Sequence, residues 1–175
     1  MQGLGRDRVV YLDTFSKVLA PSLRLGYIVA PDSLIKAFSG ARALVGRGSL
    51  TTEQHVIAAY MKEGYFEGYI RRIRSIYTER RRILIEALQA KLPWLQIQLA
   101  DQGMHIVVML PDGVDDVAVA TVASQTGSSL RALSPMSSGR LPLTGLMLGF
   151  GGFTAETLRG AVRQLGELLA GMSIK

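Results

Sequence analysis

The strongest constraint on the fold is a lysine that stands in a loop between two short apolar runs. Residues 9–12 and 25–30 are rich in β-branched and aromatic side chains, so each run predicts a buried strand. Two hydroxyl side chains come just before the loop lysine, Lys17, and Arg24 comes seven residues after it. An amine that can form a Schiff base, beside hydroxyl and guanidinium donors for a phosphate, is the set of groups that holds a phosphorylated aldehyde.

The run from Thr14 to Lys17 reads Thr-Phe-Ser-Lys, and Arg24 opens the run Arg-Leu-Gly-Tyr. Together they resemble the lysine segment of the fold-type I aminotransferases of class I/II. The resemblance implies that pyridoxal 5'-phosphate (PLP) is the cofactor and that Lys17 is the catalytic lysine that forms a Schiff base with it. It also implies that Thr14, Ser16 and Arg24 bind the phosphate of the cofactor. The alternative for this segment is a surface lysine in a loop between two strands.

The remainder of the chain predicts an α/β fold in which an antiparallel sheet is covered by helices on one face. Hydrophobic residues make up 48% of the chain, which is ample for a packed core. Pro93 ends the longest of the predicted helices. The expected helices span about 33–44, 51–62, 65–92, 114–126 and 155–170, and the expected strands about 95–99, 104–110, 129–133 and 143–150.

This order of elements, combined with the resemblance, implies the C-terminal portion of a fold-type I transferase. Residues 1–62 would be the end of the PLP-binding large domain. Residues 63–92 would be the interdomain helix, and residues 93–175 the small C-terminal domain.

Several parts of the family's active site precede the lysine: a glycine-containing phosphate loop, an aromatic side chain that stacks on the ring, and an aspartate that pairs with the pyridine nitrogen. Only sixteen residues precede Lys17 here, and the aspartates among them do not stand in the context of that aspartate. The pyridine partner matters because it lets the cofactor draw electrons from its substrate. We therefore expect these 175 residues to be an incompetent transaminase alone, and PLP to be bound in the full-length protein.

A second departure concerns recognition of the substrate. The superfamily anchors a carboxylate with an arginine that begins an Arg-Leu-x-Phe/Tyr strand near the C-terminus, and Met147 occupies that place here. A methionine cannot make the bidentate contact of a guanidinium with a carboxylate, so ordinary α-amino acid recognition is not expected from this position. Arg131 or Arg140 could substitute for it. The alternative for both arginines is a surface charge beside a loop.

Three features are most similar to the MocR type of GntR regulators: the form Tyr-Leu-x-Thr-Phe-Ser-Lys, the Leu-Gly-Phe at 148–150, and the arginine-rich stretch at 70–82. The resemblance implies an N-terminal winged helix-turn-helix, absent here, which alone would bind DNA. It also implies an aminotransferase-like domain that forms a homodimer and senses an amino acid or amino compound. Such an effector would replace Lys17 on the cofactor, and the small domain would then move.

Two other functions remain open. One is a genuine class I/II aminotransferase, acting for example on 2-aminoadipate or aromatic amino acids, although Met147 counts against it. The other is a non-catalytic dimerisation or binding remnant. In that case the 48–52 loop could donate a hydroxyl to the phosphate of a partner, or could simply connect two helices.

Charge, cysteine content and hydropathy limit the ligands and the cellular compartment that we expect. The 20 basic and 14 acidic residues give a net charge of +6, which suits an anionic ligand without requiring nucleic acid. The arginines of 71–82 could contact DNA phosphates, but a solvated face is expected because no helix-turn-helix pattern is present. The chain has no cysteine and two histidines, so no metal site is expected. No run approaches the ~20 apolar residues of a membrane span, which predicts a cytoplasmic protein.

Overall fold

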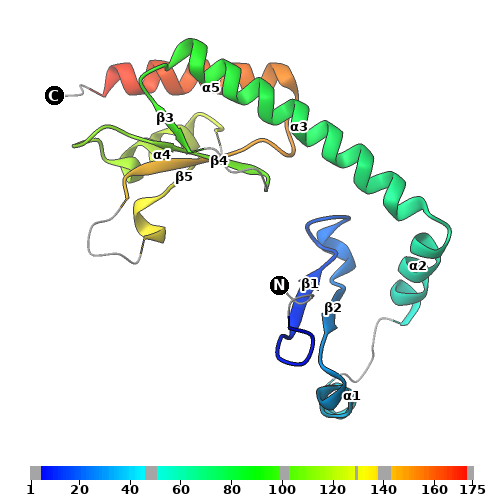
Figure 1. The fold of residues 1–175 in the computed structure, drawn as a ribbon. Helices are drawn as coiled ribbons and strands as arrows, with labels where there is room; N and C mark the ends of the chain where they lie inside the picture. Colours follow the sequence, from blue (N-terminus) through cyan, green and yellow to red (C-terminus); the bar gives the residue numbers. More distant parts are fainter. Residues whose placement is uncertain (1–4, 46–50, 99–102, 129, 138–142, 173–175) are drawn as a thin grey trace. The chain divides into compact units, whose positions relative to one another are not determined.

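A computed structural model describes residues 5–45, 51–98, 103–128, 130–137 and 143–172 of the chain (Figure 1). The chain divides into two compact units, residues 1–71 and residues 72–175. The division falls inside one long helix, so each unit takes part of that helix. The finer division into 1–62, 63–92 and 93–175 stays a prediction.

The first unit consists of a β-hairpin followed by helices. Strands β1 and β2 are antiparallel and pair Thr14 with Gly26 at the end where the lysine loop begins. The elements of this unit are β1 (Tyr11–Thr14), the short 3-10 helix η2 (Pro21–Leu23), β2 (Gly26–Val29), α1 (Asp32–Val45), α2 (Thr51–Lys62) and the start of α3 (Tyr65–Lys91).

The expected strands at 9–12 and 25–30 form only in part, and the prediction that they are buried is wrong. Every residue of β1 and β2 is exposed, and α1 has no buried residue. A buried strand needs cover on both faces of its sheet. In the described part of the chain β1 and β2 form a two-stranded sheet of their own, so their apolar side chains stay in contact with solvent.

The second unit is an antiparallel sheet of four strands with helices, as the sequence predicts. The strand order is β3-β4-β6-β5, and each neighbouring pair is antiparallel. The elements are the remainder of α3, β3 (Gln96–Gln98), β4 (His105–Met109), α4 (Asp116–Gln125), β5 (Leu130–Ala132), the 3-10 helix η3 (Ser134–Met136), β6 (Gly145–Gly149) and α5 (Ala155–Gly171).

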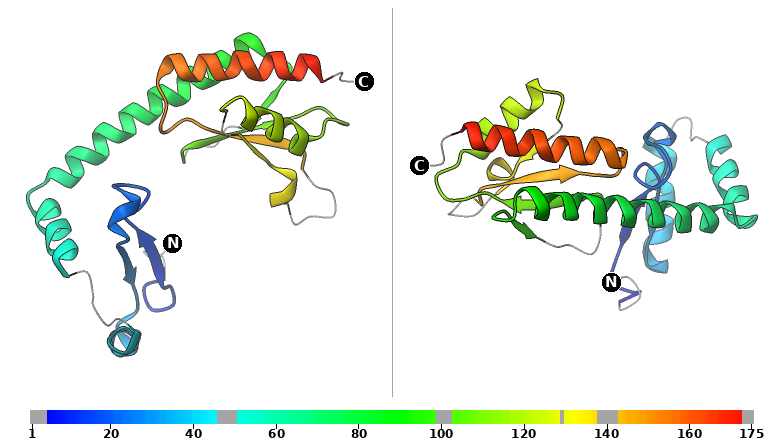
Figure 2. Two further views of the ribbon diagram at one scale, coloured as in Figure 1. Left: turned by 180° about the vertical axis from the view of Figure 1, so that it is seen from behind. Right: turned by 90° about the horizontal axis from the view of Figure 1, so that it is seen from above.

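Alternation along β4 and β6 separates the two faces of this sheet. Ile106 pairs with Leu148 and Val108 pairs with Leu146, and all four side chains are buried. They form one cluster with apolar side chains of α3, α4 and α5, so the three helices pack on the same face (Figure 2). The prediction of an antiparallel sheet covered on one face is confirmed.

Short local signals fix where the helices begin and end. Pro93 follows the last residue of α3 closely, as expected from its missing N–H. The Asp115 carboxylate accepts hydrogen bonds from two N–H groups of the first turn of α4, and the Thr154 hydroxyl accepts one from Thr157 N–H at the start of α5. These side chains satisfy donors that the first turn of a helix leaves free. The Gly-Phe-Gly-Gly run at 149–152 ends β6 and turns the chain toward α5.

Asp116 is a buried carboxylate, 2% exposed, at the start of α4. It accepts hydrogen bonds from the backbone N–H of Leu133 (3.0 Å), Ser134 (2.8 Å) and Gly145 (3.1 Å), and from the Ser134 hydroxyl (2.5 Å). Burial by itself would raise the pKa of Asp116, but the donors from Ser134, Gly145 and Leu133 outweigh it and hold the pKa below its usual range. The carboxylate thus ties α4 to the ends of β5 and β6.

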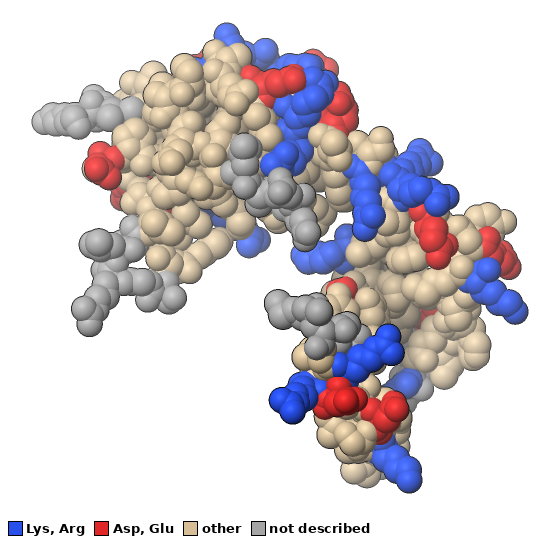
Figure 3. All heavy atoms as spheres, viewed as in Figure 1, with Lys and Arg blue, Asp and Glu red and all other residues tan. Residues whose placement is uncertain are grey.

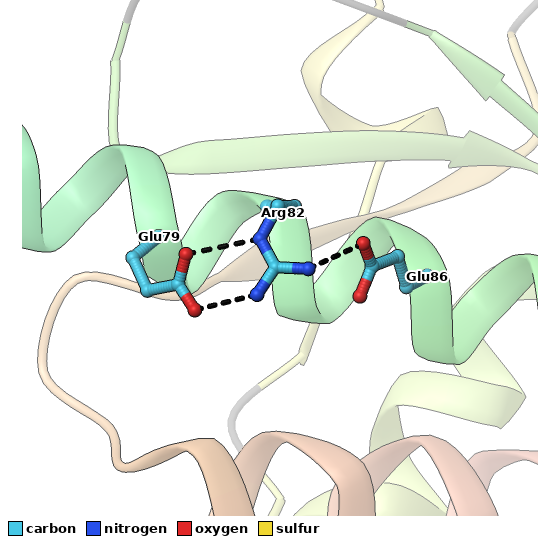
Figure 4. A network of polar contacts seen from close by, with 3 residues as sticks. All are labelled: Glu79, Arg82 and Glu86. Atoms are coloured by element: carbon cyan, nitrogen blue, oxygen red, sulfur yellow. Dashed lines mark hydrogen bonds and ion pairs between the residues drawn. The ribbon is translucent and has the colours of Figure 1, made fainter.

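Arg80 and Arg82 of α3 make side-chain contacts within the second unit, and basic side chains follow the helix in Figure 3. Arg82 binds Glu79 through two nitrogens (2.6 and 2.9 Å) and Glu86 through a third (2.5 Å), as Figure 4 shows. These hydrogen bonds raise the pKa of Arg82 and lower that of Glu79. Arg80 donates to the carbonyl of Gly151 in the turn before α5. The solvated-face interpretation agrees with these contacts.

Among the described residues, no helix combines the length and the apolar character needed to cross a membrane.

Candidate cofactor-binding site

The loop that carries Lys17 is closed by a single carbonyl oxygen. The carbonyl of Leu25 accepts hydrogen bonds from the backbone N–H of Phe15 (2.9 Å) and from the hydroxyl of Thr14 (3.0 Å). Thr14 ends β1, and Leu25 precedes β2 directly. The hairpin therefore brings the hydroxyls before the lysine next to the residue that follows Arg24.

Thr14 and Ser16 form one hydrogen-bonded pair. Their hydroxyl oxygens lie 3.0 Å apart, and the Ser16 N–H donates to the Thr14 oxygen at 3.2 Å. A threonine hydroxyl has one proton. When that proton is given to Ser16 Oγ, the Ser16 hydroxyl proton is available to a ligand. When it is given to the Leu25 carbonyl, Thr14 is a structural link in the loop and the Ser16 hydroxyl is the donor to Thr14.

Arg24 adopts a backbone conformation that its residue type rarely takes. It lies in the left-handed region (φ 43°, ψ 32°) and is the only non-glycine described with a positive φ. Its N–H donates to the Pro21 carbonyl (3.3 Å), which closes the short helix η2. A left-handed arginine costs about 1–2 kcal/mol, and such strain clusters where a side chain must be aimed for function. The arginine side chain is exposed.

Gly26 permits the two strands to approach closely. A Cβ atom added to Gly26 would lie 2.9 Å from the Asp13 carbonyl oxygen, closer than real side chains come. The glycine in the run Arg-Leu-Gly-Tyr is therefore required by the hairpin itself. A larger residue there would require the Asp13 carbonyl to shift.

Lys17 lies in a turn that a buried aromatic ring anchors. The Phe15 carbonyl accepts from the N–H groups of Val18 (3.2 Å) and Leu19 (2.8 Å), which bend the chain around the lysine. Phe15 is buried, and its ring lies 5.4 Å from that of Tyr27 and 6.1 Å from that of Phe66. The Lys17 side chain is exposed, so its amine is accessible to a ligand.

Asp13 joins two tyrosines on one face of the hairpin, an arrangement not foreseen from the sequence. Its carboxylate accepts from the hydroxyl of Tyr11 (2.6 Å) and that of Tyr27 (3.4 Å), and from the Thr14 N–H (2.7 Å). The bond to Asp13 raises the pKa of Tyr11 to about 12, and the Tyr11 hydroxyl holds the pKa of Asp13 below its usual range. The i, i+2 spacing of Tyr11 and Asp13 in a strand is the signal that could have predicted this pair.

Thr14, Ser16, Lys17 and Arg24 thus all belong to one hairpin loop of the first unit. Of the residues considered for carboxylate binding, Met147 and Arg131 lie on neighbouring strands of the second unit. Arg140 and residues 48–50 of the 48–52 loop lie outside the described residues. Thr51 and Thr52 begin α2.

Comparison with known proteins identifies the fold and the family. The profile of the family described as aminotransferase class I and II matches residues 3–135. The chain is 33% identical over 167 residues to a probable rhizopine catabolism regulatory protein, MocR, of Rhizobium meliloti, covering 94% of the chain and 34% of that protein. It is 31% identical over 170 residues to the HTH-type pyridoxine biosynthesis transcriptional regulator PdxR of Corynebacterium glutamicum, covering 97% of the chain and 37% of that protein.

Among solved structures, the kynurenine aminotransferase of Pyrococcus horikoshii in complex with PMP matches with a TM-score of 0.84 and 28% identity, covering 97% of this chain and 42% of that one. The fold is therefore part of a fold-type I, PLP-dependent transferase, as predicted. The chain belongs to the aminotransferase class I and II family. It spans about a third of the length of the curated relatives that it matches, 34% and 37%.

Proposed function

We propose that the chain is part of the PLP-binding effector domain of a MocR-type transcriptional regulator. The observation that carries the proposal is the loop that presents Ser16, Lys17 and Arg24 from one hairpin, in a chain whose relatives include two regulators. DNA would be bound by a separate helix-turn-helix domain. The effector would be an amino acid or an amino compound, and the protein a homodimer.

The donors of the loop fit the cofactor chemically. The Lys17 amine and the Arg24 guanidinium are both exposed, and no ion pair to either is present among the described residues. Ser16 has a hydroxyl proton to give when Thr14 donates to Ser16 Oγ, and Thr14 fixes the position of Ser16. A dianionic phosphate is bound best by such charge-assisted donors, and an arginine can offer it two parallel N–H groups.

Each residue of the loop would have a separate task. When bound, PLP supplies an aldehyde for the Schiff base and a ring that withdraws electrons. Lys17 would provide the amine, Arg24 and Ser16 would hold the phosphate, and Thr14 would bind the phosphate or keep the loop closed through Leu25. The strained backbone of Arg24 would aim its side chain before the ligand arrives, which lowers the entropic cost of binding.

The relatives support a regulator in preference to an enzyme. Met147 does so too, because it places an uncharged side chain in the middle of β6, where the superfamily has its carboxylate-binding arginine. An aminotransferase is the competing function because the kynurenine enzyme shares the fold. Turnover separates the two. The purified native protein should bind PLP without sustained transfer of amino groups from amino acids to a 2-oxo acid, whereas steady turnover would favour the enzyme.

Replacement of the lysine tests the site. In the native protein, Lys17→Ala should abolish the absorbance band of the lysine-bound cofactor. After borohydride reduction, mass spectrometry should no longer find the cofactor attached to the peptide that contains residue 17. Lys36→Ala is the matched control, since Lys36 is an exposed lysine of α1. A band that survives unchanged in Lys17→Ala would show that the assignment of Lys17 is wrong.

A further inference from the structure

A cavity lies between the four-stranded sheet and the helices that cover it. It encloses about 270 Å³, and every described residue that lines it belongs to the second unit. Leu130 of β5 and Leu148 of β6, which pair with each other, form its wall on the side of the sheet together with Leu84 of α3. An apolar cavity of about 150 Å³ is enough to bind benzene. This cavity therefore has room for a molecule of one or two rings.

Helix α5 forms a second wall of the cavity, and Ala161 lies at the centre of that wall. The residues three and four positions before and after Ala161 all line the cavity: Thr157, Leu158, Gln164 and Leu165. Positions with this spacing are the neighbours of a residue on the surface of a helix. Because the alanine side chain ends at Cβ, it leaves the space in front of it open. A larger side chain at position 161 would fill that space.

One polar pair belongs to the lining. The Ser128 hydroxyl donates to Gln164 Oε1 (3.3 Å) and so links the segment after α4 to α5. Backbone hydrogen bonds from Gly127 N–H to the Ser124 carbonyl (3.2 Å) and from Ser128 N–H to the Ala123 carbonyl (3.0 Å) close the end of α4 and fix the position of Ser128. The amide nitrogen of Gln164 has no hydrogen-bond partner among the described residues. It can therefore donate to a ligand, and the Ser128 oxygen can accept from one.

The lining carries no charge among the described residues. A carboxylate or ammonium group placed in the cavity would lose its hydration without gaining a counter-charge, which is a large cost. Amino acids and PLP are therefore unsuitable ligands for this cavity. An apolar lining with a few convergent polar groups suits a neutral, mostly apolar molecule that carries a hydrogen-bonding group.

We propose that this cavity binds a neutral molecule of one or two rings that carries a single hydroxyl group. The rings contact Leu130, Leu148 and Ala161. The hydroxyl oxygen accepts from the Gln164 amide, and the hydroxyl proton is donated to the Ser128 oxygen. The inference does not rest on the proposed function, because it names a ligand class distinct from PLP and from an amino-acid effector.

The experiment compares 2-naphthol with 2-naphthoate, which have the same rings but carry a hydroxyl and a carboxylate respectively. Their binding to the native protein is measured by titration calorimetry at neutral pH. 2-Naphthol should bind saturably, and its protons should give nuclear Overhauser effects to the methyl groups of Leu130 and Leu148. 2-Naphthoate should bind at least ~10-fold more weakly, because its charge finds no partner in the cavity.

Two variants place the ligand in the cavity. Ala161→Leu should weaken 2-naphthol binding roughly 10-fold or more because the added side chain takes up the space, whereas Ala170→Leu, the same change at an exposed position of α5, should leave it unchanged. Gln164→Leu, also at an exposed position, should weaken it about 2- to 10-fold, the range for one lost hydrogen bond.

Circular dichroism of each variant checks that it is folded. The proposal is overturned by a wild type that does not bind 2-naphthol saturably, by equal binding of 2-naphthoate, or by binding that a folded Ala161→Leu variant leaves unchanged. Unchanged binding in Gln164→Leu would show that the amide does not hold the hydroxyl.

Discussion

At the scale of single residues, the lysine loop depends on side chains in unusual situations. Arg24 holds a left-handed backbone that glycine would adopt without cost, yet it is an arginine. Gly26, two residues later, has no positive φ and is needed for a different reason, the close approach of the Asp13 carbonyl. Neither residue is explained by hydrophobic packing. Gly26 is explained by the close packing of the two strands, and the left-handed backbone of Arg24 fits the role proposed for this residue in binding a phosphate.

The Tyr11–Asp13 pair gives a prediction in pH. Because the pKa of Tyr11 is raised to about 12 in the folded chain, its contribution to stability is fully present below the ordinary tyrosine pKa of ~10 and is lost as the pH rises through the folded value. In Asp13→Ala, Tyr11 should ionise near ~10. Ultraviolet titration of the phenolates measures this change.

The Tyr11→Phe variant tests whether Tyr11 is the tyrosine that ionises at the raised pH. That variant should lack the ionisation near the folded value of about 12. If an ionisation near pH 12 persists in Asp13→Ala, the Asp13 carboxylate is not the cause of the raised pKa of Tyr11.

At the scale of elements, Asp116 connects α4 with the segments at the ends of β5 and β6. Its four donors come from Leu133, Ser134 and Gly145, which are 17, 18 and 29 residues away along the chain. Gly145 suits this junction, since an added Cβ would lie 2.6 Å from the Val108 carbonyl oxygen. The junction holds β5 against β6 and thereby keeps Arg131 in register with Met147.

Removal of this carboxylate should be costly. Asp116→Ala leaves buried N–H donors without an acceptor, and we expect it to lower the free energy of unfolding by roughly 3 kcal/mol. Asp112→Ala, at an exposed turn residue, should change it by less than about 0.5 kcal/mol. Denaturant unfolding followed by circular dichroism measures both variants. Equal effects would mean that Asp116 contributes no more than a surface charge.

The lowered pKa of Asp116 also predicts how the difference in stability between the wild type and Asp116→Ala depends on pH. The stabilisation is fully present above the unfolded aspartate pKa of ~3.9 and is lost as the pH falls through the lower folded value. The difference in stability between wild type and Asp116→Ala should therefore shrink only in strong acid.

At the scale of the whole molecule, the two units differ in how much they bury. The second unit has a continuous core of β4, β6 and three helices, whereas β1, β2 and α1 have no buried residue. An isolated two-stranded hairpin is marginally stable in water. Apolar side chains such as Leu12 (67% exposed) and Leu44 (84% exposed) add surface that a stable protein usually covers.

Hydrogen exchange should show this contrast in the 175-residue chain. Amides of β4 and β6 should exchange slowly, near the rate of global unfolding, because their opening exposes the core. Amides of β1 and β2 should exchange much faster. Mass spectrometry of peptides from both sheets measures the two rates, and equal protection would contradict the description of the first unit.

Prediction from the sequence was good where a short pattern determines the outcome. The helices and strands formed close to their expected ranges, since alternation, Pro93 and the capping residues act within a few residues. The lysine loop was found because its residues are close in sequence. Burial of the hairpin strands was predicted wrongly, because an apolar run shows what a strand could bury and not whether anything covers it.

The helices and strands, the lysine loop and its family resemblance could be predicted from the sequence. The fold was needed to show that Arg131 stands beside Met147, that Asp116 meets donors from two distant segments, and that the hairpin is exposed. The difference lies in the distance along the chain over which each interaction acts. Backbone propensity and capping act between near neighbours, whereas strand register, burial and the charge around a buried carboxylate depend on which distant segments meet.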